Sequence, residues 1–206
     1  MDSDLTLDFI IIIVLIIANG LFSMTELAIV NAKKRKLEEM AEAGNERAKK
    51  AFELAENPNN MFSTIQIGIT LVGILTGLYS GATFSGPLEE ILVANIPSIE
   101  PYAASISSLL IVAIITYLSL VIGELVPKRL ALNSPESIAV VVSKPIYWLS
   151  VALKPIVSFL GVSTEFLLKL LGVTVKEAVS YTHLDVYKRQ EEITHVPGYK
   201  RNRNQS

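Results

Sequence analysis

Hydrophobic residues in this chain gather into long runs that charged residues interrupt at only a few places. A hydrocarbon core about 30 Å thick needs about 20 helical residues to cross it, and residues 5–30, 61–82 and 104–126 reach that length. Inside a bilayer the backbone must hydrogen-bond internally, so each of these segments is predicted to be a spanning helix. The predicted fold class is therefore all-α and integral to the membrane.

Residues 33–56 show a different pattern, with seven basic and six acidic side chains and apolar side chains between them. This pattern predicts amphipathic helix lying at the cytoplasmic surface of the membrane. Gly44-Asn45 is the predicted break between two short helices. A soluble loop helix without membrane contact is the alternative.

Residues 138–172 are apolar enough for a fourth span, but Lys144-Pro145 and Lys154-Pro155 interrupt them. A charge at the centre of a bilayer costs about 2.5 to 3.5 kcal/mol on insertion scales, and proline breaks the helical hydrogen-bond ladder. We therefore expect broken helices along the cytoplasmic interface, with the lysines extending to the headgroups. A fourth spanning helix is the alternative.

Basic residues directly follow the first and third predicted spans, at 33–36 and 128–129, so both flanks are expected on the cytoplasmic side. Residues 83–103 contain no lysine or arginine and are expected to form an outside loop. The N-terminus is then outside and the C-terminus cytoplasmic, in the cell (plasma or inner) membrane. The leading residues are acidic, so residues 5–30 are expected to be a retained helix and not a signal peptide.

The composition narrows the function classes further. A net charge of -2 over 206 residues gives no basic surface for nucleic acid, and the absence of cysteine excludes disulfides and thiolate metal sites. Residues 1–179 are expected to form one membrane domain. The polar residues 180–206, which hold both histidines, are expected to be a non-native or disordered tail.

Polar and small residues form a stripe on each predicted span, at steps of three or four residues that place them on one helix face. The three stripes are Asn19, Ser23 and Glu26, with Thr25 beside them; Ser63, Gln66, Thr70, Gly73 and Gly77; and Thr116, Ser119, Gly123 and Pro127. Packing between helices is the alternative to ligand binding for residues of these types.

Two carboxylates and one proline strengthen the case for a site. Glu26 and Glu124 lie near span ends, where an intramembrane acid indicates function unless it extends to the interface. Pro127 cannot donate its amide, so the Gly123 carbonyl is expected to accept another partner. Asn19 by itself is expected to form an interhelical hydrogen bond. If the stripes converge, their oxygens suit a hard cation such as Mg²⁺.

Three segments, in order, resemble motifs of the CNNM/CorC magnesium transporter family. Phe22 to Ala28 (FSMTELA) resembles the signature of its first helix, Pro58 to Thr70 the start of its second, and Gly123 to Lys128 (GELVPK) the end of its third. The resemblance covers roughly residues 5–172.

The resemblance implies a homodimer of three-helix subunits with a cytoplasmic juxtamembrane belt formed by residues 33–56 and 138–172. It also implies export of Mg²⁺, with Na⁺ as the coupled counter-ion. The metal-site positions carried over by the motifs are Ser23, Glu26, Ser63, Gly123 and Glu124, with Thr25, Gln66 and Thr70 as secondary candidates.

Two features depart from the family pattern. Many relatives have an asparagine ligand where this chain has Ile69, so Gln66 or Thr70 would have to replace it. Relatives also continue into a CBS-domain pair that binds ATP, which is absent from this sequence, so nucleotide regulation is not assigned to it.

A membrane anchor and an enzyme are the two function classes other than transport. In a membrane anchor and dimerisation module for a cytoplasmic sensing domain, the polar stripes would serve only packing. An enzyme is not expected, because the predicted spans contain no histidine or cysteine with which to activate a nucleophile.

Overall fold

The computed structural model describes residues 2–56 and 58–172, and within them every element is a helix or a turn, as the all-α prediction requires. The elements are α1 (Asp2–Asn31), α2 (Lys34–Glu42), α3 (Glu46–Glu56), α4 (Pro58–Asn95), the 3₁₀ helix η1 (Pro97–Tyr102), α5 (Ala103–Leu120), the π-helical turn η2 (Val121–Leu125), α6 (Val126–Asn133) and α7 (Pro135–Leu170). The chain divides into two compact units, Met1–Gly161 and Val162–Ser206. In the second, the described residues complete α7 and a following turn.

Four helical segments are long and apolar enough to cross a membrane: Leu5–Asn31, Pro58–Asn95, Pro97–Asn133 and Pro135–Leu170. The first three contain the three expected spans, and the fourth covers all but the last two residues of the segment expected at the interface, 138–172. Length and composition thus identify a multi-pass membrane protein. The arrangement with three crossings stays a prediction.

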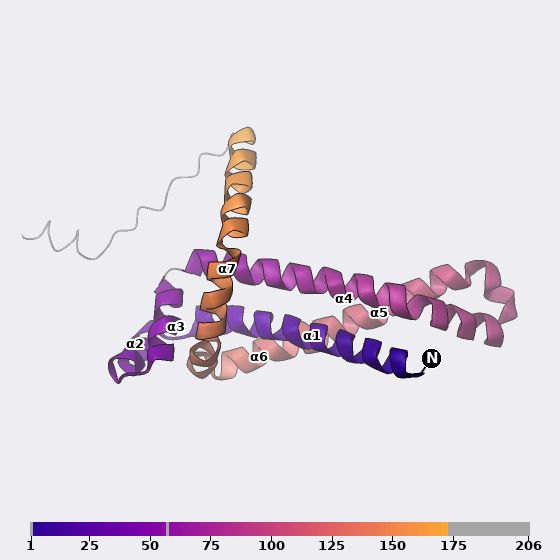
Figure 1. Cartoon of the computed structure of the whole chain (residues 1–206), viewed down its shortest axis with the longest axis horizontal. Coiled ribbons are helices and arrows are strands. Elements are labelled where there is room, and N and C mark those ends of the chain that lie inside the picture. Colours follow the sequence, from indigo (N-terminus) through magenta and orange to yellow (C-terminus); the bar gives the residue numbers. More distant parts are fainter. Residues whose placement is uncertain (1, 57, 173–206) are drawn as a thin grey trace, which may run out of the picture. The chain divides into compact units, whose positions relative to one another are not determined.

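Within the first unit, α1 contacts α4, and α4 contacts α5, so these three long helices run side by side (Figure 1). α1 also contacts η2 and α6, the segments that follow α5. Gly68 shows why α1 and α4 approach closely, since a Cβ there would lie 2.7 Å from Cζ of Phe22. The aromatic ring of α1 occupies the space that the glycine leaves.

The break between α2 and α3 lies where the sequence predicted it, at Gly44-Asn45. Gly44 has φ of 92°, a left-handed conformation that glycine adopts without strain and that commonly ends a helix. The Asn45 side-chain oxygen then accepts hydrogen bonds from the amides of Arg47 and Ala48, at 3.0 and 3.1 Å, and caps α3. Two short helices therefore replace one long one.

The apolar face of α2 and α3 packs against protein. Leu37, Ala48 and Ala51 are fully buried in a cluster that also contains Ile29 of α1 and Ile65 of α4. The first part of α7 adds Ala139, Val140 and Ile146 to the same cluster. We call α2, α3 and α7 up to Ile146 the belt. Its amphipathic pattern is explained by burial against the ends of the long helices.

Polar contacts fix the belt as well. The Ser143 hydroxyl is fully buried and lies 2.9 Å from both the Arg47 and Val140 carbonyl oxygens, to which it donates. The Lys36 ammonium lies 3.4 Å from the buried carboxylate of Glu136. These contacts join segments about 100 residues apart in sequence. The belt therefore forms only when α2 and α3 pack against α7.

Two sequence predictions are wrong. Residues 83–95 are helical in α4 and not loop, because leucine, isoleucine, alanine and glutamate there favour helix, and Pro87 removes only one backbone donor. α7 is likewise one helix through Pro145 and Pro155 and not a set of broken helices. Each proline leaves the neighbouring backbone bonds in place, and packing of the buried face holds the first part of α7.

Candidate functional site

The polar face of α1 meets the π-helical turn η2 at a very close contact. A Cβ on Gly20 would lie 2.9 Å from Cγ of Pro127 and 3.1 Å from the Ile122 carbonyl oxygen. A Cβ on Gly123 would lie 3.2 Å from the Ile16 carbonyl oxygen. Only glycine at both positions permits this approach. We call the contact between Ile16–Ser23 and Ile122–Pro127 the α1–η2 contact.

Asn19 spans this contact with a hydrogen bond. Its Nδ2 atom donates to the Gly123 carbonyl oxygen at 3.2 Å. Two predictions are thereby confirmed: Asn19 forms an interhelical hydrogen bond, and the Gly123 carbonyl, one turn before Pro127, accepts a partner from outside its own helix. The local backbone is a π-turn, in which the Val126 amide donates to the Val121 carbonyl. Such turns are frequent at functional sites.

The other atom of the same side-chain amide is unsatisfied. Asn19 Oδ1 is buried and has no hydrogen-bond partner among the described residues. A buried acceptor without a donor costs about 1 to 3 kcal/mol, so such an atom calls for an explanation. Ser23 lies one turn further along the same face and is 1% exposed. Asn19 Oδ1 is therefore the buried oxygen of this contact that lacks a partner, and the Ser23 hydroxyl lies one turn away from it.

The carboxylates differ in their surroundings. Glu124 Oε1 lies 2.6 Å from the Lys128 ammonium, one turn along the same helix, and both side chains are more than 30% exposed. Solvent screens such a pair, so it can open at little cost. Glu26 is half-buried, and within the described residues it has no ion pair or hydrogen bond. Glu124 is therefore the acid that adjoins the α1–η2 contact through its neighbour Gly123.

The remaining predicted positions are not joined to this contact. Ser63 donates to the Asn59 carbonyl of its own helix at 3.2 Å, and Thr25 donates to the Leu21 carbonyl at 2.7 Å. Gln66 and Thr70 are exposed. None of the hydrogen bonds in the described part of the chain connects these four to Gly123 or Glu124. A hydrogen bond thus links α1 to η2, whereas none among the described residues links the α4 candidates to this contact.

The buried face of α4 explains this difference. It carries Met61, Thr64, Ile65 and Gly68, which face the belt cluster and α1, and not the predicted stripe. Ile69, at the position where relatives have a ligand, packs against the belt cluster. The predicted stripe on α4 is thus not an internal packing surface of this chain.

A metal centre of charged ligands is not formed by the described residues, since no three His, Cys, Asp or Glu side chains come together there. The oxygens available at the α1–η2 contact are an amide oxygen, a hydroxyl and a backbone carbonyl, with Glu124 beside them. Neutral oxygens with one carboxylate suit a hard, weakly held cation better than a permanently bound one.

One polar contact was missed by sequence reasoning. The Tyr79 hydroxyl of α4 donates to the Asp8 carboxylate of α1 across a sequence separation of 71 residues. Asp8 attracted attention only as one of several leading acids, and no short motif pairs it with a tyrosine. Its contact with α4 results from helix packing, which no pattern in the sequence shows.

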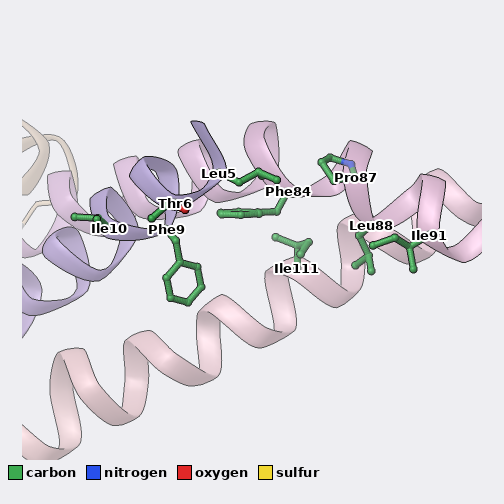
Figure 2. A pocket seen from close by; sticks show the side chains of 9 residues that line it. All are labelled: Leu5, Thr6, Phe9, Ile10, Phe84, Pro87, Leu88, Ile91 and Ile111. Atoms are coloured by element: carbon green, nitrogen blue, oxygen red, sulfur yellow. The ribbon is translucent and has the colours of Figure 1, made fainter. Parts of the chain in front are cut away.

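The first unit also contains an apolar groove. Figure 2 shows nine side chains from α1, α4 and α5 gathered around it: Leu5, Thr6, Phe9, Ile10, Phe84, Pro87, Leu88, Ile91 and Ile111. Its volume is about 570 Å³, and the rings of Phe9 and Phe84 meet edge to face at 6.5 Å. With no charged lining side chain, the groove does not suit a cation.

Comparison with known proteins identifies the family. Residues 10–193 match the family model of the cyclin M (CNNM) transmembrane N-terminal domain. This match reaches into residues 180–193, part of the predicted tail, which lies outside the described residues. The chain is similar to "UPF0053 protein sll0260" of Synechocystis sp., with 49% identity over 89% of this chain and 41% of the relative.

Two further relatives are more distant. "UPF0053 protein YugS" of Bacillus subtilis is 32% identical over 84% of this chain and 40% of its own length. The "Polyamine export protein" of Escherichia coli strain K12 is 28% identical over 86% of this chain and 39% of its own length. The chain therefore spans about two fifths of the length of these relatives. It belongs to the cyclin M (CNNM/CorC) family, through that family's transmembrane N-terminal domain.

Proposed function

We propose that this chain is the membrane domain of a transporter whose cargo is Mg²⁺, exported from the cytoplasm in exchange for Na⁺. The observation that carries the proposal is the buried, unpartnered Oδ1 of Asn19 beside the Gly123 carbonyl. In a membrane an unsatisfied acceptor is retained at a cost, and a cation that visits the site would offset that cost.

Mg²⁺ binds about six oxygens and gives up water reluctantly. Asn19 Oδ1, the Ser23 hydroxyl and the Gly123 carbonyl would supply neutral oxygens, and Glu124 would supply charge after parting from Lys128. The remaining positions would be filled by water or by Glu26 and Ser63 after a movement of the helices. A partly hydrated ion bound this way is held loosely enough to be released on the other side.

The exposed stripe on α4 supports a homodimer. Gln66 and Thr70 are exposed, and a Cβ on Gly73 or Gly77 would have no atom within 4 Å. Small residues on a spanning helix typically allow another helix to approach closely. We propose that a second copy of the chain covers this face, with the N-terminus outside and the C-terminus cytoplasmic as the basic flanks indicate.

A second candidate cargo comes from one relative. The Escherichia coli relative is named a polyamine export protein, and a polyamine is a flexible cation whose ammonium groups donate hydrogen bonds. The unpartnered Asn19 Oδ1 at the α1–η2 contact and the Glu124 carboxylate beside it could accept them. Mg²⁺ and a polyamine would thus compete for one site, which makes them separable by experiment.

Flux through proteoliposomes tests the proposal. The chain is reconstituted with an internal Mg²⁺ dye, and Glu124→Gln is compared with Glu39→Gln. Glu39 is the matched control because it also forms an ion pair four residues away on its helix, with Arg35 at 2.9 Å. We expect Mg²⁺ flux that Glu124→Gln abolishes and Glu39→Gln leaves unchanged.

Radiolabelled spermidine is measured in a parallel set of vesicles. Spermidine flux without Mg²⁺ flux would replace the cargo with a polyamine while keeping the site. Absence of both fluxes would overturn the transport proposal and favour the membrane anchor and dimerisation module. Unchanged flux in Glu124→Gln would remove that carboxylate from the site.

A further inference from the structure

A second groove, separate from the α1–η2 contact, lies where the end of α3, the start of α4 and the middle of α7 meet. Its volume is about 310 Å³. Its lining combines polar and apolar side chains: Glu53, Leu54, Asn60, Met61, Tyr147, Ser150, Val151, Lys154, Val157 and Ser158. None of these residues takes part in the proposed cation site, so the groove needs its own explanation.

The groove contains an unsatisfied donor. The Ser150 hydroxyl oxygen is buried and has no hydrogen-bond partner among the described residues. A buried hydroxyl is normally paired, and the cost of leaving it unpaired favours a ligand or ordered water beside it. Asn60, on the first turn of α4, contributes a side-chain amide to the same lining. Both groups can donate a hydrogen bond to an anionic oxygen.

The charges of the groove leave one cation unbalanced. Glu53 is already paired, because its Oε2 lies 2.7 Å from the Lys50 ammonium. The hydrogen bond to Glu53 raises the pKa of Lys50, and the Lys50 ammonium also lies 4.4 Å from the centroid of the Tyr147 ring. Lys154 has no ion pair with any described residue. Of the two charged residues that line the groove, Lys154 is therefore the one without a charged partner among the described residues.

The start of α4 adds partial positive charge to the groove. The first amides of a helix have no partner within the helix, and the helix dipole places partial positive charge at that end. Asn60 and Met61 belong to the first turns of α4 and line the groove. Free hydroxyl and amide donors, a lysine and a helix N-terminus together form an environment that typically binds phosphate.

The occupant is argued from the surroundings of Lys154. This lysine lies in the middle of α7, a helix apolar enough to enter a membrane, where an unpaired charge is costly. Val151 and Val157 line the groove beside it, and the neighbouring Trp148 and Ile156 are large apolar side chains that stay exposed. A ligand with a phosphate at one end and hydrocarbon at the other satisfies both parts.

We infer that this groove binds the phosphate headgroup of an anionic phospholipid, with Lys154 and Ser150 on the phosphate and the acyl chains along α7. Basic pockets beside membrane helices commonly bind such headgroups. The lipid would neutralise Lys154 and tie the belt to the bilayer. A soluble phosphate shares the headgroup's chemistry but not its need for the apolar wall.

The experiment uses the fluorescence of Trp148, the single tryptophan of the chain, whose ring lies 5.9 Å from that of the groove residue Tyr147. The purified chain in detergent is titrated with short-chain phosphatidylglycerol, short-chain phosphatidylcholine and inorganic phosphate. We expect saturable binding of phosphatidylglycerol, at least tenfold weaker binding of phosphatidylcholine, and no response to inorganic phosphate at matched concentrations.

Variants assign the binding to the groove. Lys154→Gln should weaken phosphatidylglycerol binding at least tenfold, Lys154→Arg should retain it, and Ser150→Ala should weaken it several-fold. Lys144→Gln is the matched control, because Lys144 is also an exposed lysine that precedes a proline on α7 but does not line the groove. Circular dichroism of each variant verifies that it is folded.

Three results would overturn the inference. Equal binding of the two lipids would show that charge does not matter, and saturable binding of inorganic phosphate with the same dependence on Lys154 would assign the groove to a soluble anion. Equal losses in Lys144→Gln and Lys154→Gln would place the lipid contact elsewhere on α7.

Discussion

The α1–η2 contact depends on two glycines, each of which leaves room for different neighbouring atoms. Gly20 makes room for Pro127 and the Ile122 carbonyl, and Gly123 makes room for the backbone of Ile16. Because both neighbours at Gly20 are rigid, a methyl group there cannot be accommodated by a rotamer change. The close approach is what allows Asn19 to reach the Gly123 carbonyl.

Gly20→Ala should therefore destabilise the chain by about 1 to 3 kcal/mol, the usual cost of overpacking a tight interface. Gly86→Ala on α4 is the control, since a Cβ there meets nothing within 4 Å and Gly86 lies outside the polar stripe of α4. Thermal unfolding in detergent, followed by circular dichroism, should show a lower Tm for Gly20→Ala and an unchanged or slightly higher one for Gly86→Ala. Equal Tm values for the two variants would mean that the contact is looser than described.

At this scale the sequence revealed the candidate residues on α1 and η2 but not their partners. The spacing of Asn19 and Ser23 and the proline at 127 were sufficient to predict a shared face and a freed carbonyl. The pairing of Tyr79 with Asp8, and the packing of Ile69 against the buried cluster of the belt, depend on how helices rotate against one another. Several rotations satisfy the same pattern of polar and apolar residues.

The π-turn η2 is the element that shapes the site. Pro127 follows it and supplies no amide to the Gly123 carbonyl, and the extra residue in the turn shifts the helix face that meets α1. A regular α-helix through this region would direct the carbonyl along its own axis. The π-turn thus explains how the GELVPK motif presents the Gly123 carbonyl to Asn19.

Pro127→Ala tests that link, because the new amide would compete with Asn19 for the Gly123 carbonyl. We expect Mg²⁺ affinity to fall about tenfold while stability stays the same or rises, since proline disfavours helix interiors. Pro87→Ala makes the same chemical change within α4 and should leave affinity unchanged. Affinity that survives Pro127→Ala would show that the freed carbonyl is not a ligand.

Element boundaries were harder to predict than element types. Hydropathy located the apolar part of α4, but a helix continues wherever local residues support it, so α4 extends to Asn95. Lys144-Pro145 and Lys154-Pro155 were expected to break α7, yet a proline removes one donor and the rest of the ladder persists. The Gly44-Asn45 break was predictable because a left-handed glycine and an asparagine cap act locally.

At the scale of the whole molecule, the belt and the long helices belong to one packed unit within Met1–Gly161. The belt buries its apolar face on α1 and α4, so a movement of these long helices relative to one another would also strain the belt.

Single cysteines decide the number of crossings, because the natural sequence contains none. Asn133→Cys and Leu171→Cys lie on either side of α7 in sequence, and both positions are exposed. With α7 at the interface, a membrane-impermeant maleimide should label both from the cytoplasmic side. Labelling from opposite sides would establish α7 as a fourth spanning helix.

Calorimetric titration of Mg²⁺ into the purified chain measures whether the α1–η2 contact binds a divalent cation. Ser23→Ala is compared with Thr76→Val, which alters a buried hydroxyl that donates to the Val72 carbonyl of its own helix. We predict saturable Mg²⁺ binding that Ser23→Ala weakens about tenfold and Thr76→Val preserves. The absence of saturable heat in the unmodified chain would show that the α1–η2 contact does not bind Mg²⁺.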